Sequence, residues 1–222
     1  MSMRPLSLLE TRVLGVLVEK SLTVPDSYPL SLNSLTLGCN QKTARDPVLG
    51  AAEGEVQAAV DALKTLNLAF ESSGSRVTRY EHNLARALAL PSQSVALLAV
   101  LMLRGPQTAS ELRINCERLH RFADLSAVEG FLDELAARVS EKGGVLALKV
   151  PRAPGAREAR WTHLLCGPPE AGAYAVAPEG EPFLPITELA ALKADHAALR
   201  GELGELRALV ERLYAELGVR RD

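Results

Sequence analysis

Two histidines are the residues of this sequence that are best suited to chemistry. His82 and His163 lie in similar surroundings, TRYEHNL and ARWTHLL. A histidine can act as general base for a serine or cysteine nucleophile, or as a metal ligand. No serine, cysteine or carboxylate is spaced to support such a role, and no glycine-rich phosphate loop, HExxH motif or paired zinc-ligand motif occurs. We therefore predict a non-enzymatic protein without catalytic residues, metal site or cofactor, in which both histidines are structural.

The cysteines indicate a reducing compartment. Cys39, Cys116 and Cys166 lie far apart and form no CxxC pair, which predicts reduced, buried thiols rather than disulfides. The N-terminal segment shows no charged stretch followed by an apolar block, and no apolar run reaches the ~18 residues that a membrane-spanning helix needs. These features predict a cytoplasmic protein that does not associate with membranes.

The composition favours a helical protein with two domains. The chain has 222 residues, of which 47% are apolar and 4% aromatic, enough to give each of two domains a core. Its 25 basic residues stand against 27 acidic ones. A protein that attracts nucleic acid through its overall charge has a clear excess of basic over acidic residues. Any binding of nucleic acid by this chain must therefore come from local basic patches.

An internal repeat organises residues 5–166. The segment RVTRYEHNL, which starts at Arg76, matches REARWTHLL, which starts at Arg157, and the shared aromatic position (Tyr80 and Trp161) is expected to lie in the core. Upstream, VQAAVDALKTLN matches VEGFLDELAARV, and both have helical periodicity. Each copy is typical of three helices followed by a hairpin, the order of a winged helix. We predict winged-helix domains at residues 5–86 and 87–166.

Local signals place the ends of several elements. Capping boxes at Ser7, Thr108 and Ser126, each with a glutamate three residues later, predict three helix starts. The first hairpin is predicted to run through residues 69–71, turn around Gly74 and return through residues 77–78. The second hairpin starts with residues 145–150 and has the tip PRAPGAR, whose prolines and glycine favour a projecting, irregular loop.

Several segments resemble one known family. YPLSLNSL, CNQKTARDP, LRGPQTASELR and PGAREARWTHL are similar, in this order, to segments of the YceH-like family of bacterial tandem winged-helix proteins. The resemblance covers residues 5–166. It implies the tandem winged-helix fold and an intracellular bacterial setting. The family has no established activity, so the resemblance implies no functional residues.

The remaining sequence predicts a linker and a coiled coil. Residues 167–185 contain five prolines and three glycines, which indicates a flexible linker. Residues 186–218 follow a heptad pattern and predict a coiled-coil helix. The seam of this helix comprises Leu189, Leu192, His196, Leu199, Leu203, Leu206, Val210, Leu213 and Leu217.

Charges beside this seam favour a parallel homodimer. In that arrangement three pairs of opposite charge face each other across the two chains: Glu188 with Lys193, Asp195 with Arg200, and Glu202 with Arg207. An antiparallel dimer would set acid against acid and base against base. We predict the parallel dimer; the alternative is that the helix folds back on the winged helices of its own chain.

The third helix of each predicted domain is acidic. Glu55 and Asp61 in the first, and Glu129 and Asp133 in the second, would repel phosphates, which disfavours insertion of these helices into the major groove. The candidate contacts to nucleic acid are instead basic residues of the wings and of the loop before the first of these helices. They are Lys42, Arg45, Arg76, Arg79, Lys149, Arg152, Arg157 and Arg160.

Taken together, these features predict a mostly helical protein with small β-hairpins, two winged-helix domains, a linker and a coiled-coil helix. We predict that it binds duplex DNA and acts in transcription regulation. The alternative is a protein–protein adaptor built on winged helices that does not bind DNA, since acidic third helices and a near-neutral charge fit that role too. The sequence does not distinguish between these two functions.

Overall fold

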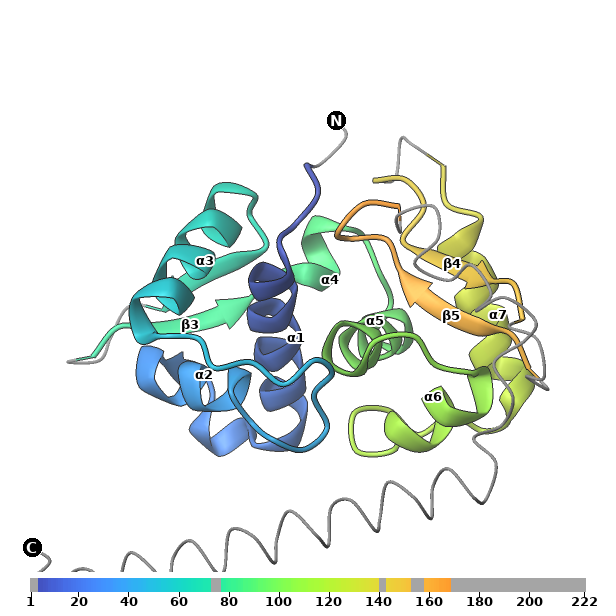
Figure 1. The fold of residues 1–222 in the computed structure, drawn as a ribbon, viewed down its shortest axis with the longest axis horizontal. Helices are drawn as coiled ribbons and strands as arrows, with labels where there is room; N and C mark the ends of the chain where they lie inside the picture. The colour runs from blue at the N-terminus through green and yellow to red at the C-terminus, as the bar shows by residue number, and fades with distance from the viewer. Residues whose placement is uncertain (1–3, 73–76, 140–142, 153–157, 169–222) are drawn as a thin grey trace, which may run out of the picture. The chain divides into compact units, whose positions relative to one another are not determined.

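The structure, a computed structural model, describes residues 4–72, 77–139, 143–152 and 158–168, which all lie in one compact unit (Figure 1). These residues are mostly helical and carry small antiparallel sheets. Within these ranges, every helix is too short or too polar to span a bilayer. The predicted linker from residue 169 onward and the predicted coiled-coil helix (186–218) lie outside the described residues.

The first repeat contains three helices and a three-stranded sheet. Its elements are α1 (Leu8–Thr23), the 3-10 helix η1 (Pro25–Ser27), β1 (Leu30–Ser31), α2 (Leu32–Cys39), α3 (Glu53–Thr65), β2 (Ala69–Ser72) and β3 (Arg79–His82). The strand order is β1-β3-β2, with antiparallel pairing throughout. The predicted hairpin is present, but its return strand begins at Arg79 rather than Val77, because Ser72 pairs with Arg79 and the ladder ends there.

The second repeat has the same order of elements. They are α5 (Ser92–Arg104), α6 (Ala109–Asn115), α7 (Leu125–Ala136), β4 (Ala147–Val150) and β5 (Arg160–His163), preceded by the one-turn helix α4 (Leu84–Ala87). Strand β4 begins at Ala147 rather than Val145, paired with His163. An isolated bridge joins Gln107 to Trp161. It corresponds to the pair of Leu30 with Tyr80 in the first repeat.

Two of the three predicted capping boxes are confirmed. At the start of α1, the Glu10 backbone nitrogen donates to Ser7 Oγ at 3.1 Å, and the Glu10 carboxylate accepts from the Ser7 backbone nitrogen at 2.7 Å. Thr108 and Glu111 form the same reciprocal pair at the start of α6. Each box satisfies two backbone donors that the first turn of a helix would otherwise leave without a partner.

The capping box predicted at Ser126 is wrong. Helix α7 begins at Leu125, and Asp124 caps it by accepting a hydrogen bond from the Ala127 backbone nitrogen at 2.8 Å. Ser126 therefore lies inside the first turn. An aspartate is as good an N-cap as a serine, and here it comes first along the chain.

Helices α1 and α5 pack against each other and join the two repeats (Figure 1). Every residue of α1 from Glu10 to Val18 is buried, and so is every residue of α5 from Ser94 to Leu103. Gly15 allows the close approach, because a Cβ atom there would lie 3.0 Å from the Leu103 side chain. One apolar cluster extends from Leu6 to Leu165, so the two repeats share a single core.

The aromatic residues of the repeat lie in this core, as predicted. Tyr80 and Trp161 are only 3% and 2% exposed. The Tyr80 hydroxyl donates to Gln57 Oε1 at 2.8 Å, which ties the first hairpin to α3. Burial of a large aromatic ring beneath each hairpin fixes the hairpin against the helices.

Candidate nucleic-acid interface

Arg79 and Arg160 occupy matched positions in the two hairpins, and the side chain of each donates a hydrogen bond to a backbone carbonyl elsewhere in the protein. Arg79 Nη1 donates to the Pro29 carbonyl at 2.7 Å, and Arg160 Nη1 donates to the Pro106 carbonyl at 2.8 Å. Arg160 also pairs with the carboxylate of Glu111, at 3.1 Å and 3.2 Å. Both arginines thus hold a hairpin to the segment that enters the second helix of its repeat, which occupies part of the hydrogen-bonding capacity that a phosphate would use.

Arg45 lies inside the protein. Its side chain has no exposed surface, and its guanidinium binds the Glu19 carboxylate at 2.6 Å and the Gly38 carbonyl at 3.1 Å. Burial raises the pKa of Glu19, but the hydrogen bond and the charge of Arg45, together with Lys20, outweigh burial, so the pKa is lowered overall. A buried arginine paired with a partly buried carboxylate cannot reach a phosphate, so Arg45 does not belong to the candidate interface.

A second buried arginine holds the same loop. Arg12, on α1, donates to the carbonyls of Cys39 at 3.3 Å and Pro47 at 2.7 Å, and burial lowers its pKa. Together with Arg45 it fixes the long loop between α2 and α3. Two buried arginines therefore hold the predicted basic loop in place: Arg45 from the loop itself and Arg12 from α1.

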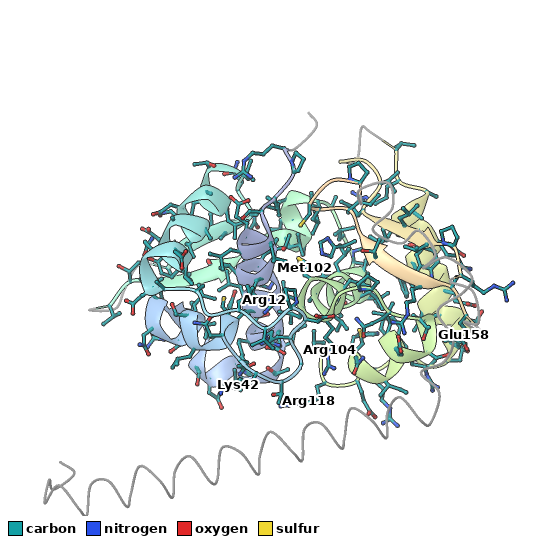
Figure 2. The ribbon with its side chains drawn as sticks, viewed as in Figure 1. Arg12, Lys42, Met102, Arg104, Arg118 and Glu158 are labelled. Carbon is teal, nitrogen blue, oxygen red and sulfur yellow. The ribbon has the colours of Figure 1, made fainter. Side chains whose placement is uncertain are left out.

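Three other cations belong to this loop, to the end of α5 and to the segment after α6. The Asp46 backbone nitrogen donates to the Leu103 carbonyl at 2.8 Å, which joins the loop to the end of α5, where Arg104 lies. Figure 2 shows Lys42, Arg104 and Arg118 toward the same edge of the unit. Lys42 and Arg118 are exposed, and among the described residues neither has a hydrogen bond or an ion pair. We call Lys42, Arg104 and Arg118 the junction cations, because they come from both repeats.

Sequence reasoning found Lys42 but missed Arg104 and Arg118. Arg118 follows the C-terminus of α6, in RINCERLHR, where Glu117 beside it makes the run look balanced in charge. Arg104 ends α5, and its charge lowers the pKa of the Cys116 thiol, although burial dominates and raises that pKa to about 12. The three arginines in RINCERLHR could have indicated a basic surface. Only the packing of the two repeats, however, places Arg104 and Arg118 toward the same edge of the unit as Lys42 (Figure 2).

Besides Arg160, two more predicted cations of the second hairpin are exposed. Lys149 lies 5.4 Å from the centre of the Trp161 ring, a cation–π contact that leaves its ammonium at the surface. Arg152 is exposed as well. Arg76 and Arg157 lie outside the described residues.

The third helices present acids to solvent, as predicted. On α3, Glu55 and Asp61 are exposed, and Gln57, whose amide could otherwise read a base, donates to Asp61 at 3.1 Å. On α7, Glu129 and Asp133 are exposed. These helices therefore carry the wrong charge for the major groove.

The histidine environments correct one prediction. His82 Nε2 lies 3.1 Å from Ser21 Oγ, so a serine does approach a histidine, from a position far away in the sequence. The Ser21 hydroxyl donates to the Val18 carbonyl at 2.8 Å, and Nδ1 of His82 is buried without a partner among the described residues. A catalytic base needs a group that orients its second nitrogen, and the described residues provide none for His82.

His163 repeats this environment. Its Nδ1 is likewise buried without a partner in the described part of the chain, and burial lowers its pKa to about 4. The ring is therefore neutral near pH 7. Such a histidine fits the predicted structural role.

The cysteines are free, and two are buried as predicted. Burial raises the pKa of Cys39 and of Cys116 to about 12. Cys166 is exposed, so the prediction of burial is wrong for this residue. Across the described ranges, no three cysteine, histidine or acidic side chains are close enough together to bind a metal ion.

Comparison with known proteins identifies the family. Residues 6–156 match the family described as "Protein of unknown function, DUF480". A UPF0502 protein of Burkholderia pseudomallei (strain 668) is 59% identical over 98% of this chain and 92% of its own length. A UPF0502 protein of Leptothrix cholodnii is 58% identical over 99% of this chain and 98% of its own length. The chain therefore belongs to the YceH-like DUF480/UPF0502 family, whose function is not established.

Proposed function

We propose that each repeat is a winged helix and that the chain binds duplex DNA in a regulatory role. The order of three helices and a hairpin, found twice, supports the first part. The short contact between the hairpin and the segment before the second helix, found in both repeats, supports it too. A shared fold alone does not determine function, so the second part depends on the surface.

The junction cations are the observation that carries this proposal. Lys42 and Arg118 project into solvent without a counter-ion among the described residues, and Arg104 lies toward the same edge (Figure 2). Lysine and arginine at such positions neutralise phosphates, whatever the base sequence. Binding then depends on the DNA backbone, with exposed cations of the second hairpin, such as Lys149, as additional contacts.

Acids on α3 and α7 keep these helices out of the major groove in this proposal. Contacts from loops and wings position a protein on the duplex but read few bases. We therefore expect weak sequence preference from the single chain. The proposal includes no catalytic step, metal or cofactor.

The test is fluorescence anisotropy of the full-length protein with a random-sequence duplex. We expect binding at ~50 mM salt that weakens steeply by ~200 mM, because phosphate contacts release counter-ions. Absence of binding at the lower salt concentration would reject DNA binding.

We also propose that the chain forms a parallel homodimer through residues 186–218. The support is the heptad of leucines and the three complementary charge pairs beside it. Leu199→Asp combined with Leu206→Asp places charge in the seam and should give a folded monomer by light scattering. A variant that remains dimeric would show that the chain associates elsewhere.

One observation favours the adaptor function as second candidate. Leu37 on α2 and Ile114 on α6 occupy matched positions of the two repeats, and they are 65% and 72% exposed. Contiguous exposed apolar surface is typical of sites that bind protein, and in this alternative the two residues contribute to such surfaces. If the anisotropy experiment finds no binding, this function becomes the leading one.

A further inference from the structure

A pocket of about 390 Å³ lies where the two repeats meet. The first repeat contributes Leu8, Asp46 and Pro47, while α5 contributes Leu101 and Met102. Thr162 and His163, at the end of the second hairpin, and Cys166, which follows it, line the other side of the pocket. Its volume is within the range of small-molecule sites, which combine apolar walls with a few polar groups.

Asp46 provides the charge of this pocket. In the described part of the chain, no hydrogen bond or ion pair reaches its carboxylate. Asp46 also interacts with the charge of Arg12, whose pKa it raises against the larger lowering effect of burial. Arg12 itself directs its donors to the carbonyls of Cys39 and Pro47. Among the described residues, the carboxylate oxygens are therefore open to a ligand.

Gly105 lies beside the carboxylate. Its φ of 72° is a left-handed conformation that favours glycine, and a Cβ atom at this position would lie 3.5 Å from Asp46 Oδ2. Any larger residue would add strain and narrow the pocket at its charged end.

The other polar groups of the wall are neutral near pH 7. Burial lowers the pKa of His163 to about 4 and raises that of the Cys166 thiol. Thr162 carries a hydroxyl. No lysine or arginine lines this pocket among the described residues, so its wall presents a single carboxylate beside an apolar surface.

We propose that this pocket binds a small organic amine, whose ammonium group pairs with the Asp46 carboxylate while its apolar body packs on the exposed side chains of Leu8, Pro47 and Pro168. A charged hydrogen bond at the edge of an apolar site provides both affinity and orientation. Because residues of both repeats line the pocket, a bound ligand contacts both repeats and stabilises the folded unit. This inference does not depend on DNA binding.

Met102 offers a direct reporter. The chain has three methionines, and the other two are Met1 and Met3. In the full-length protein labelled at the methionine methyl carbon, titration with phenylbutylamine should shift the Met102 methyl signal to saturation. Phenylbutyrate, which has the same body and the opposite charge, should bind at least tenfold more weakly. No shift with the amine, or equal affinity for both compounds, would overturn the proposal.

Asp46→Asn tests the charge itself. Loss of a charge-assisted hydrogen bond should weaken phenylbutylamine binding by roughly tenfold or more. Glu129→Gln, which removes an exposed acid from α7, is the matched control and should leave binding unchanged. Leu8→Trp fills the pocket from a half-exposed position and should abolish binding without loss of fold by circular dichroism. Unchanged affinity in Asp46→Asn would contradict the assignment of Asp46.

Discussion

The Arg45 guanidinium has no contact with solvent, and the Glu19 carboxylate balances its charge at 2.6 Å. Arg160 makes a similar pair with Glu111, but there both side chains are about half exposed. Arg118 has neither burial nor a counter-ion among the described residues. The sequence identified such residues as cations but could not separate these three environments, because burial depends on packing between segments far apart along the chain.

Removal of the Glu19 charge should leave the positive charge of Arg45 buried without the negative charge that balances it. We expect Glu19→Gln to lower the free energy of unfolding by about 3 kcal/mol, the usual result of breaking a buried ion pair. Urea denaturation measures this. Lys64→Gln, which breaks exposed pairs with Asp61 and Glu71, should stay within about 1 kcal/mol of wild type. Equal effects of the two substitutions would contradict the clamp role of Arg45.

The neutral, buried ring of His163 should make stability depend on pH. Its pKa is near 4 in the folded protein and about 6.5 in the unfolded chain, so acid protonates the unfolded state first. The contribution is present above about pH 6.5 and is lost progressively as the pH falls toward 4, by up to about 3 kcal/mol. Urea denaturation between pH 7.5 and 4.5 should show this loss, and His163→Leu should reduce it. An equal loss in the variant would assign the pH dependence to other groups.

At the scale of elements, most helices followed from short sequence signals. The capping boxes located the starts of α1 and α6, and the helical periodicity of VQAAVDALKTLN predicted α3, whose buried face carries Val56, Val60 and Leu63. The start of α7 was misplaced because Asp124 and Ser126 are both good caps, and only the backbone path selects between them. The strand ends shifted by two residues because register depends on the pairing partner.

The cap of α7 can be tested with two substitutions. Asp124→Ala removes the acceptor for the Ala127 backbone nitrogen and should lower the free energy of unfolding by about 1 kcal/mol. Ser126→Ala should change it by less than about 0.5 kcal/mol, since Ser126 is an exposed residue of the first turn. Thermal or urea unfolding compares them. A larger effect at Ser126 would restore the capping box that the structure excludes.

At the scale of the whole described unit, the repeat was readable from the sequence but the arrangement of its copies was not. Matched segments such as those around Tyr80 and Trp161 revealed two copies of one pattern. The run VALLAVLML in α5 is apolar on every face, a sign of a helix buried on all sides. Its partner across the repeats, α1, could not be identified from periodicity. The grouping of the junction cations and the proposed amine pocket both arise from this packing, which explains why the sequence showed Lys42 but neither the group nor the pocket.

The most direct test of the proposed function is the salt dependence of DNA binding in the variant Lys42→Gln combined with Arg118→Gln. If both residues contact phosphates, the slope of log affinity against log salt should fall in magnitude by about 2 relative to wild type, for any duplex sequence. Glu117→Gln, which removes the acid beside Arg118, is the control and should bind more tightly. A slope that is unchanged in the double variant would contradict the claim that the junction cations form the DNA-binding surface.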